Sequence, residues 1–211
     1  MKNAAIVLAC CSVCFASSAV FADMMTQNGM GLNEIVTLHI PGMLGDNLTV
    51  YAGQDSLTYD GQNLVGYCVD LNHYAGTADV TVQDVTTLNH GDFVAYLLDT
   101  YGSLVTTNRQ AAALGVAIWE VVSEPNTSFD TTSGRFYITG NDQTAADANA
   151  LLADLTATID TNPDWHVWDS SVHVLHSDTA QSFAVWTGPP VPEPATLSLL
   201  ALGGLAMLRR R

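Results

Sequence analysis

Basic side chains are scarce in this chain of 211 residues, which has six Lys and Arg against 21 Asp and Glu. Four of the six lie at the ends, as Lys2 and as Arg209, Arg210 and Arg211. Residues 23–190 therefore carry two basic and 20 acidic side chains, a net charge close to −18. Such a surface repels phosphate backbones and anionic lipid headgroups, so we expect no nucleic-acid partner and no membrane binding through basic patches.

The first 22 residues have the composition of a secretory signal peptide. Lys2 precedes an apolar run over residues 4–22 that closes on small residues, so we expect cleavage after Ala22. The alternative is a lipoprotein signal, because residues 7–10 resemble a lipobox and would leave a lipidated Cys10. Only about six residues would then separate Lys2 from the cleavage site, which is short for the apolar region of such a signal.

Cysteine is also scarce once this segment is removed. Three of the four cysteines lie in the predicted signal, so the exported chain keeps Cys68 alone. A single thiol cannot form an internal disulfide framework. It must be buried, paired between molecules or used in chemistry.

The C-terminus combines three features in a fixed order. Pro192, Glu193 and Pro194 precede an apolar run over residues 195–208, and the three terminal arginines follow it. As a helix this run would be about 21 Å long, against roughly 30 Å for the hydrocarbon core of a bilayer. It is therefore a marginal transmembrane helix, which the arginines would hold on the cytoplasmic side of the inner membrane.

This order resembles the PEP-CTERM sorting signal of Gram-negative bacteria. The resemblance implies residues 188–194 as a proline-rich linker and residues 195–211 as a sorting helix with its arginine cluster. It also implies processing by membrane enzymes called exosortases and delivery to the cell surface or an extracellular matrix. The alternative is a plain C-terminal anchor, which has the same topology but keeps its tail.

The region between the two signals, residues 23–187, reads as one domain of short strands followed by helices. Two helices are marked by apolar spacing and caps: residues 93–101 after Asp92, and residues 143–159 after Asn141. These patterns predict an α+β fold with about three helices. Strands are predicted at residues 35–38, 48–51, 56–59, 64–71 and 80–82, and again within 165–186.

The third predicted helix, residues 107–122, is apolar on every side, which indicates a core helix. Thr107 and Gln110 have the spacing of a capping box, in which each side chain bonds to the other residue's backbone amide.

Two short motifs resemble the bacterial thioester domains of surface proteins. Cys68 follows Tyr67 and precedes Asp70 by two positions, and about 50 residues later the core helix carries Ala117-Ile118-Trp119. The resemblance implies a β-rich barrel or sandwich with attendant helices. It also implies an internal thioester between the cysteine and a glutamine two residues before the Ala-Ile-Trp. A host amine attacks such a thioester, the thiolate leaves and the protein becomes covalently attached.

In this chain the glutamine position is occupied by Gly115, which has no carboxamide. Glycine inside a helix costs about 1 kcal/mol relative to alanine, so it indicates either close approach of another backbone or loss of a larger side chain. Of the possible substitutes, Gln110 is committed to the predicted capping box, and Gln54 and Gln62 lie upstream in the strands. We therefore predict that the thioester has been lost, with a covalent adhesin that uses a non-standard glutamine as the alternative.

Other site chemistries have weaker signals. Cys68, Asp70 and His73 could form a hydrolase only if the thiol and the imidazole met within one strand and its loop. His173 and His176 are three apart on a predicted strand, which turns them to opposite faces and separates them as metal ligands, and His166 lies apart. The aspartates show no calcium-loop spacing. We therefore expect a non-enzymatic surface or matrix protein without cofactor or metal.

Overall fold

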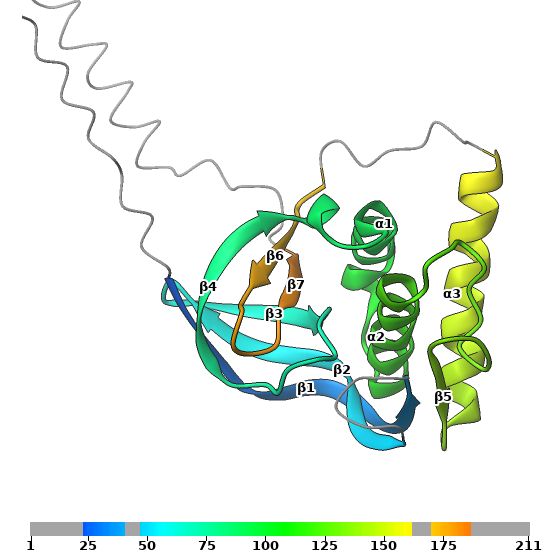
Figure 1. Cartoon of the computed structure of the whole chain (residues 1–211), viewed down its shortest axis with the longest axis horizontal. Coiled ribbons are helices and arrows are strands. Elements are labelled where there is room, and N and C mark those ends of the chain that lie inside the picture. Colours follow the sequence, from blue (N-terminus) through cyan, green and yellow to red (C-terminus); the bar gives the residue numbers. More distant parts are fainter. Residues whose placement is uncertain (1–22, 41–46, 162–169, 187–211) are drawn as a thin grey trace, which may run out of the picture.

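The computed structural model describes residues 23–40, 47–161 and 170–186. These residues form a mixed α/β structure in which a seven-stranded antiparallel sheet lies beside three α-helices (Figure 1). The predicted signal peptide, the linker and the sorting helix lie outside the described residues. Within the described residues no helix has the length and apolar character needed to cross a membrane.

Six of the seven strands pair in a closed ring. The sheet order is β2-β3-β7-β6-β4-β1-β5, and β1 also pairs with β2. All strands except β5 therefore form a barrel, and β5 adds to it by pairing with β1. Between the barrel and sandwich alternatives, the pairings therefore give a barrel. The strands are β1 (Asp23–His39), β2 (Leu48–Tyr59), β3 (Gln62–Cys68), β4 (Thr77–Asp84), β5 (Tyr137–Thr139), β6 (Val172–His176) and β7 (Phe183–Trp186).

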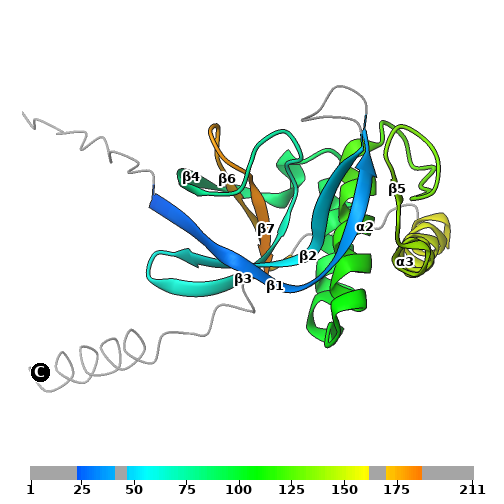
Figure 2. The same ribbon diagram turned by 90° about the horizontal axis from the view of Figure 1, so that it is seen from below.

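The hairpin of β1 and β2 is much longer than predicted. The separate strands expected at residues 48–51 and 56–59 are one continuous strand, and β1 begins twelve residues before the predicted start at residue 35. Gly29 (φ +135°) lies at a register shift, and Gly53 (φ +140°) also has a conformation that glycine adopts readily. One half of the hairpin belongs to the barrel, and the other half runs along α2 (Figure 2).

The helices are α1 (Gly91–Tyr101), α2 (Asn108–Ser123) and α3 (Asp142–Thr161), with short 3₁₀ turns at Val85–Thr87 and Gly102–Leu104. The capping box of α2 is confirmed, since Thr107 accepts from the Gln110 backbone and Gln110 accepts in return. The predicted cap of α1 at Asp92 is wrong: His90 occupies the cap position in a left-handed conformation, and Asp92 lies in the first turn.

Helix α2 is the centre of the core. It packs against the β1–β2 hairpin, against α1 and against α3, so α2 lies between the strands and α3 (Figure 1). Its residues 111–121 are all buried, which confirms the prediction that this helix has no solvent-facing side over most of its length. Because α2 contacts both layers, it determines how the Ala-Ile-Trp motif lies relative to Cys68.

Candidate functional site around Cys68

Cys68 is the last residue of β3 and is only 4% exposed. Its Sγ donates a hydrogen bond to the Asp70 carbonyl oxygen at 3.2 Å. Burial raises the pKa of the Cys68 thiol far above its ordinary value, so the sulfur stays protonated at neutral pH. A protonated, buried thiol is a poor nucleophile and behaves as a small apolar side chain.

The strand that ends at Cys68 and helix α2 meet directly. Trp119 donates from Nε1 to the Cys68 carbonyl oxygen at 2.9 Å, while Ala117 and Ile118 are buried in the core. Tyr67 points to the opposite side of the strand and lines a cavity of about 190 Å³ with Gln54. Burial raises the pKa of Tyr67 to about 12. The two motifs identified in the sequence are therefore brought together by tertiary contacts.

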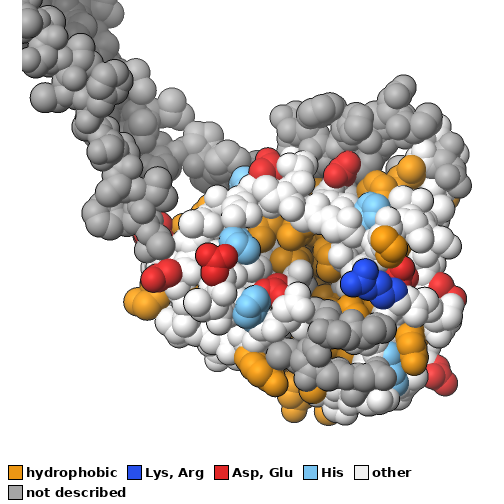
Figure 3. Space-filling model, viewed as in Figure 1, with side chains coloured by type: hydrophobic (Ala, Val, Ile, Leu, Met, Phe, Trp, Pro, Cys, Tyr) orange, Lys and Arg blue, Asp and Glu red, His pale blue; other side chains and the backbone are white. Residues whose placement is uncertain are grey.

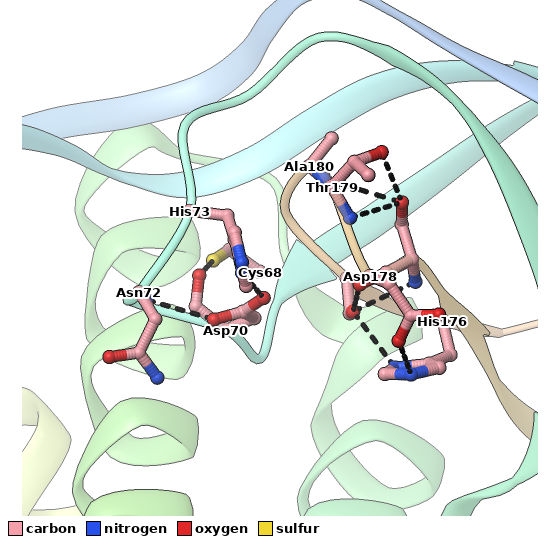
Figure 4. Close-up of polar contacts among 10 residues, drawn as sticks. Cys68, Asp70, Asn72, His73, His176, Asp178, Thr179 and Ala180 are labelled. Carbon is pink, nitrogen blue, oxygen red and sulfur yellow. Dashed lines mark hydrogen bonds and ion pairs between the residues drawn. The ribbon is translucent and has the colours of Figure 1, made fainter.

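The segment after Cys68 is held by Asp70. One carboxylate oxygen of Asp70 accepts from the Asn72 backbone N–H at 2.8 Å, and the other lies 2.6 Å from His73 Nδ1 (Figure 4). The hydrogen bonds of the described residues include none between His73 and the Cys68 sulfur. The His73 imidazole is thus paired with the Asp70 carboxylate. Among the described residues it makes no hydrogen bond through which it could take the proton of the Cys68 thiol.

Gly115 lies at a close approach of α2 to β2. A Cβ atom on Gly115 would be 3.0 Å from the Gly53 backbone nitrogen and 3.4 Å from the Gly53 Cα. A side chain at this position would begin in tight contact with the β2 backbone, which would have to shift by a few tenths of an ångström to admit it. Of the two explanations considered for this glycine, the structure shows close backbone approach.

The glutamines considered as substitutes are not hydrogen-bonded to Cys68. Gln110 accepts through Oε1 from the backbone N–H groups of Thr106 and Thr107 at 2.9 and 3.1 Å. Gln54 lies in the cavity beside Tyr67, and Gln62 is exposed at the start of β3.

Two other glutamines, Gln27 and Gln181, line the same cavity as Cys68. Their positions on β1 and on the β6–β7 turn carry no local sequence signal, since distant strand pairing places them there.

The cavity beside Cys68 has a volume of about 330 Å³ and contains a second buried titratable group. Asp55 on β2 is 4% exposed and accepts a hydrogen bond from Gln27 Nε2. Burial raises the pKa of Asp55 to about 6, and the bond from Gln27 opposes this rise only in part. The cavity is also lined by Trp119, His73 and Tyr74.

A larger hollow of about 610 Å³ shares Leu71 with this cavity and is lined by Asp70, His176 and Arg135. Figure 3 shows that this side of the molecule is hollowed, with hydrophobic side chains at the bottom and charged and histidine side chains around it. His176 Nε2 lies 3.3 Å from Asp178 Oδ1 (Figure 4). At this hollow, Asp70 is thus paired with His73 and His176 with Asp178.

The histidines do not form a metal centre in the described part of the chain. His173 and His176 both lie on β6, His176 pairs with Asp178, and no three His, Cys, Asp or Glu residues of the described ranges are grouped as metal ligands. His166 lies outside the described residues, as do the sorting residues from Pro192 to Arg211 and the predicted cleavage site at Ala22.

Comparison with known protein families gives one match, to the PEP-CTERM protein-sorting motif over residues 190–211. The chain carries a PEP-CTERM sorting motif. This confirms the prediction made from the proline motif, the apolar run and the arginines, and it implies export, recognition by an exosortase and membrane-associated sorting. No curated protein and no solved structure matches the chain.

Proposed function

We propose that this protein is an exosortase-sorted component of the cell surface or extracellular matrix, with a non-enzymatic folded domain. In this proposal the domain shares its architecture with thioester domains but has lost the thioester. The sorting motif at residues 190–211 supports delivery to the surface. The barrel, the core helix and the Trp119–Cys68 hydrogen bond support the likeness of the domain.

The contact between Gly115 and Gly53 is the observation that carries the loss of the thioester. A thioester requires the thiol and a carboxamide to condense with release of ammonia. The helix position expected to supply the carboxamide is a glycine, and a Cβ atom there would lie 3.0 Å from the Gly53 nitrogen. A cysteine hydrolase needs a thiolate and a histidine that takes its proton. The raised pKa of Cys68 and the pairing of His73 with Asp70 both argue against that activity.

Intact mass and thiol labelling test this proposal on the purified protein. We expect the mass calculated from the sequence after signal removal, with no ammonia lost. We also expect Cys68 to react with a maleimide when the chain is unfolded, and only slowly when it is folded, because the side chain is buried. A mass lower by one ammonia, with Cys68 blocked until methylamine is added, would replace the proposal with a covalent adhesin.

The covalent adhesin remains the second candidate because Gln27 and Gln181 line the cavity that contains Cys68. Condensation of either carboxamide with the thiol would form a thioester and release ammonia. Gln27→Glu and Gln181→Glu separate the two residues in the mass measurement, since only the residue that supplies the acyl group would abolish the loss of ammonia.

Sorting is tested separately by replacing Pro192, Glu193 and Pro194 with alanine. We expect the protein to remain in the inner-membrane fraction, while the unaltered chain reaches the cell surface or the medium. Equal distribution of both proteins would remove the exosortase step and leave a plain anchor.

A further inference from the structure

Strands β2 and β3 separate part-way along their length. Their pairing runs from Tyr59–Gln62 to Asp55–Gly66 and stops there, and β3 continues beside β7 to Cys68. Residues 48–54 of β2 therefore pair only with β1 among the described residues. In the part of the chain that the structure describes, one edge of β2 therefore has no strand partner for its backbone N–H and C=O groups over this stretch.

This edge lacks two features that often protect a strand edge, charged side chains and proline. Residues 48–53, Leu-Thr-Val-Tyr-Ala-Gly, contain no charge and no proline, and three of the first four are typical of strands. Tyr51 is 56% exposed, and its partner on β1, Ile35, is 55% exposed. Residues 48–51 are half-buried or exposed, whereas Ala52 and Gly53 are buried. An uncharged edge of this kind can accept another strand along its exposed part.

The cavity beside Cys68 lies between this edge and the segment of residues 71–75. That segment is held in place by two backbone hydrogen bonds, from Gln181 N to Tyr74 O at 3.1 Å and from Gln27 N to Gly76 O at 3.3 Å. Tyr74 is 70% exposed at this side of the cavity. The space beside β2 is therefore bounded by a fixed wall.

A buried carboxylate without a cation lies where β2 and β3 separate. Asp55 accepts from Gln27, and no ion pair among the described residues includes Asp55. His73 lines the same cavity but is paired with Asp70. A buried carboxylate is costly unless a cation or several donors satisfy it, so Asp55 offers a specific anchor for a basic side chain.

We propose that an extended segment of a partner protein adds to the free edge of β2 at residues 48–52 and places one Lys or Arg side chain in the cavity beside Asp55. Backbone hydrogen bonds to β2 would hold the strand, and the carboxylate would select its basic residue. The net charge close to −18 over residues 23–190 attracts a basic partner and repels a second copy of this chain. The inference rests on the strand arrangement, on Asp55 and on the acidic charge, and it does not require a thioester.

Fluorescence anisotropy of the purified full chain with labelled Thr-Val-Lys-Val-Thr tests the proposal. We expect saturable binding of this peptide and at least about tenfold weaker binding when glutamate or leucine replaces its lysine. Asp55→Asn should weaken binding of the lysine peptide by a similar factor. Asp60→Asn, which removes one charge from the exposed β2–β3 turn, should leave it unchanged.

Hydrogen exchange locates the peptide. Binding should slow exchange of the amides of residues 48–53 and leave those of β4 unaffected. Lack of binding at millimolar peptide, equal binding of the glutamate peptide, or no protection at 48–53 would each overturn the proposal. Protection of this edge without peptide, in a chain that sediments as a dimer, would overturn it in favour of self-association. The peptide comparison uses the unaltered chain, so the test stands even if Asp55→Asn fails to fold.

Discussion

Strand β2 has two different surroundings within a few residues. At Gly53 its backbone lies against α2, so closely that a single carbon on Gly115 would be 3.0 Å from the Gly53 nitrogen. Along residues 48–54 its outer edge has no strand partner among the described residues and borders a cavity that contains Cys68 and Asp55. We call the contact of Gly53 with α2 the closed side of β2, and the edge over residues 48–52 the open side.

This difference bears on two activities, the thioester that the sequence motifs suggest and recognition of a partner strand. Covalent chemistry between α2 and Cys68 needs a side chain at Gly115, where the β2 backbone leaves little room. Recognition of a partner needs accessible backbone and a specific anchor, which the open edge and Asp55 supply. We therefore infer that a surface role for this domain depends on the open side. Four substitutions in and around α2 test whether the closed side is a packed core without covalent chemistry.

Gly115→Gln should have the largest effect. The added side chain would push β2 away from α2, so we expect a loss of about 3 kcal/mol in the free energy of unfolding, measured by urea denaturation. Gly102→Gln is the control, because a Cβ atom there would meet nothing within 4 Å. A Gly115→Gln protein of unchanged stability that has also lost one ammonia would show that the helix can reach Cys68 after all.

Trp119→Phe removes the hydrogen bond to the Cys68 carbonyl oxygen and part of a buried ring. We expect a loss of about 2 kcal/mol, from the unsatisfied carbonyl and the smaller side chain together. Ile118→Val on the same helix loses only a buried methyl group and should cost about 1 kcal/mol. Equal losses for the two variants, measured by thermal unfolding, would mean that the hydrogen bond contributes little to the closed side.

Glu120→Gln tests a buried carboxylate on the same helix. Glu120 is 1% exposed, its Oε1 accepts from the Asp130 N–H at 2.7 Å, and burial raises its pKa to about 7. The folded protein therefore binds more protons than the unfolded chain between about pH 4.5 and pH 7, so stability falls as pH rises through this window.

We expect the unaltered protein to lose about 2 kcal/mol from this group between pH 5 and pH 8, and Glu120→Gln to remove that part of the pH dependence. Urea denaturation at the two pH values measures it. Asp79→Asn, on the exposed side of β4, should keep the original dependence. Identical pH profiles for the unaltered protein and Glu120→Gln would contradict the assignment.

Cys68→Ala should have the smallest effect, about 1 kcal/mol, because the thiol acts as a small buried side chain with one weak hydrogen bond. Thermal unfolding of Cys68→Ala beside Cys68→Ser measures the cost. A loss of several kcal/mol in both variants would indicate that the sulfur is part of a covalent cross-link, and the closed side would then be the reactive one.

Several features could be predicted from the sequence because they depend on neighbouring residues. The capping box at Thr107 and Gln110 needs only three residues of spacing, and the all-apolar pattern of α2 identifies a helix with no solvent-facing side. A strand over residues 64–71 was also predicted, and β3 covers Gln62–Cys68, so it ends three residues earlier. The sorting motif is short and contiguous, and the family match confirms it.

The reach of β1 and β2 could not be predicted, because residues 23–34 are mostly polar and acquire strand structure from pairing with β2 and β4. The three-residue strand β5 was missed because it carries too short a pattern and exists through its pairing with β1.

The sequence by itself determined the sorting motif and the acidic charge, and it placed Cys68 and Gly115 in the two motifs that were compared with thioester domains. Only the tertiary structure decided what these mean at the site. Strand pairings between distant residues bring Gln27, Asp55 and Gln181 to the cavity beside Cys68, and they leave the edge of β2 open. The packing of α2 on Gly53 explains why residue 115 is a glycine. The distance between these two backbone segments is set by the fold and cannot be inferred from either segment alone.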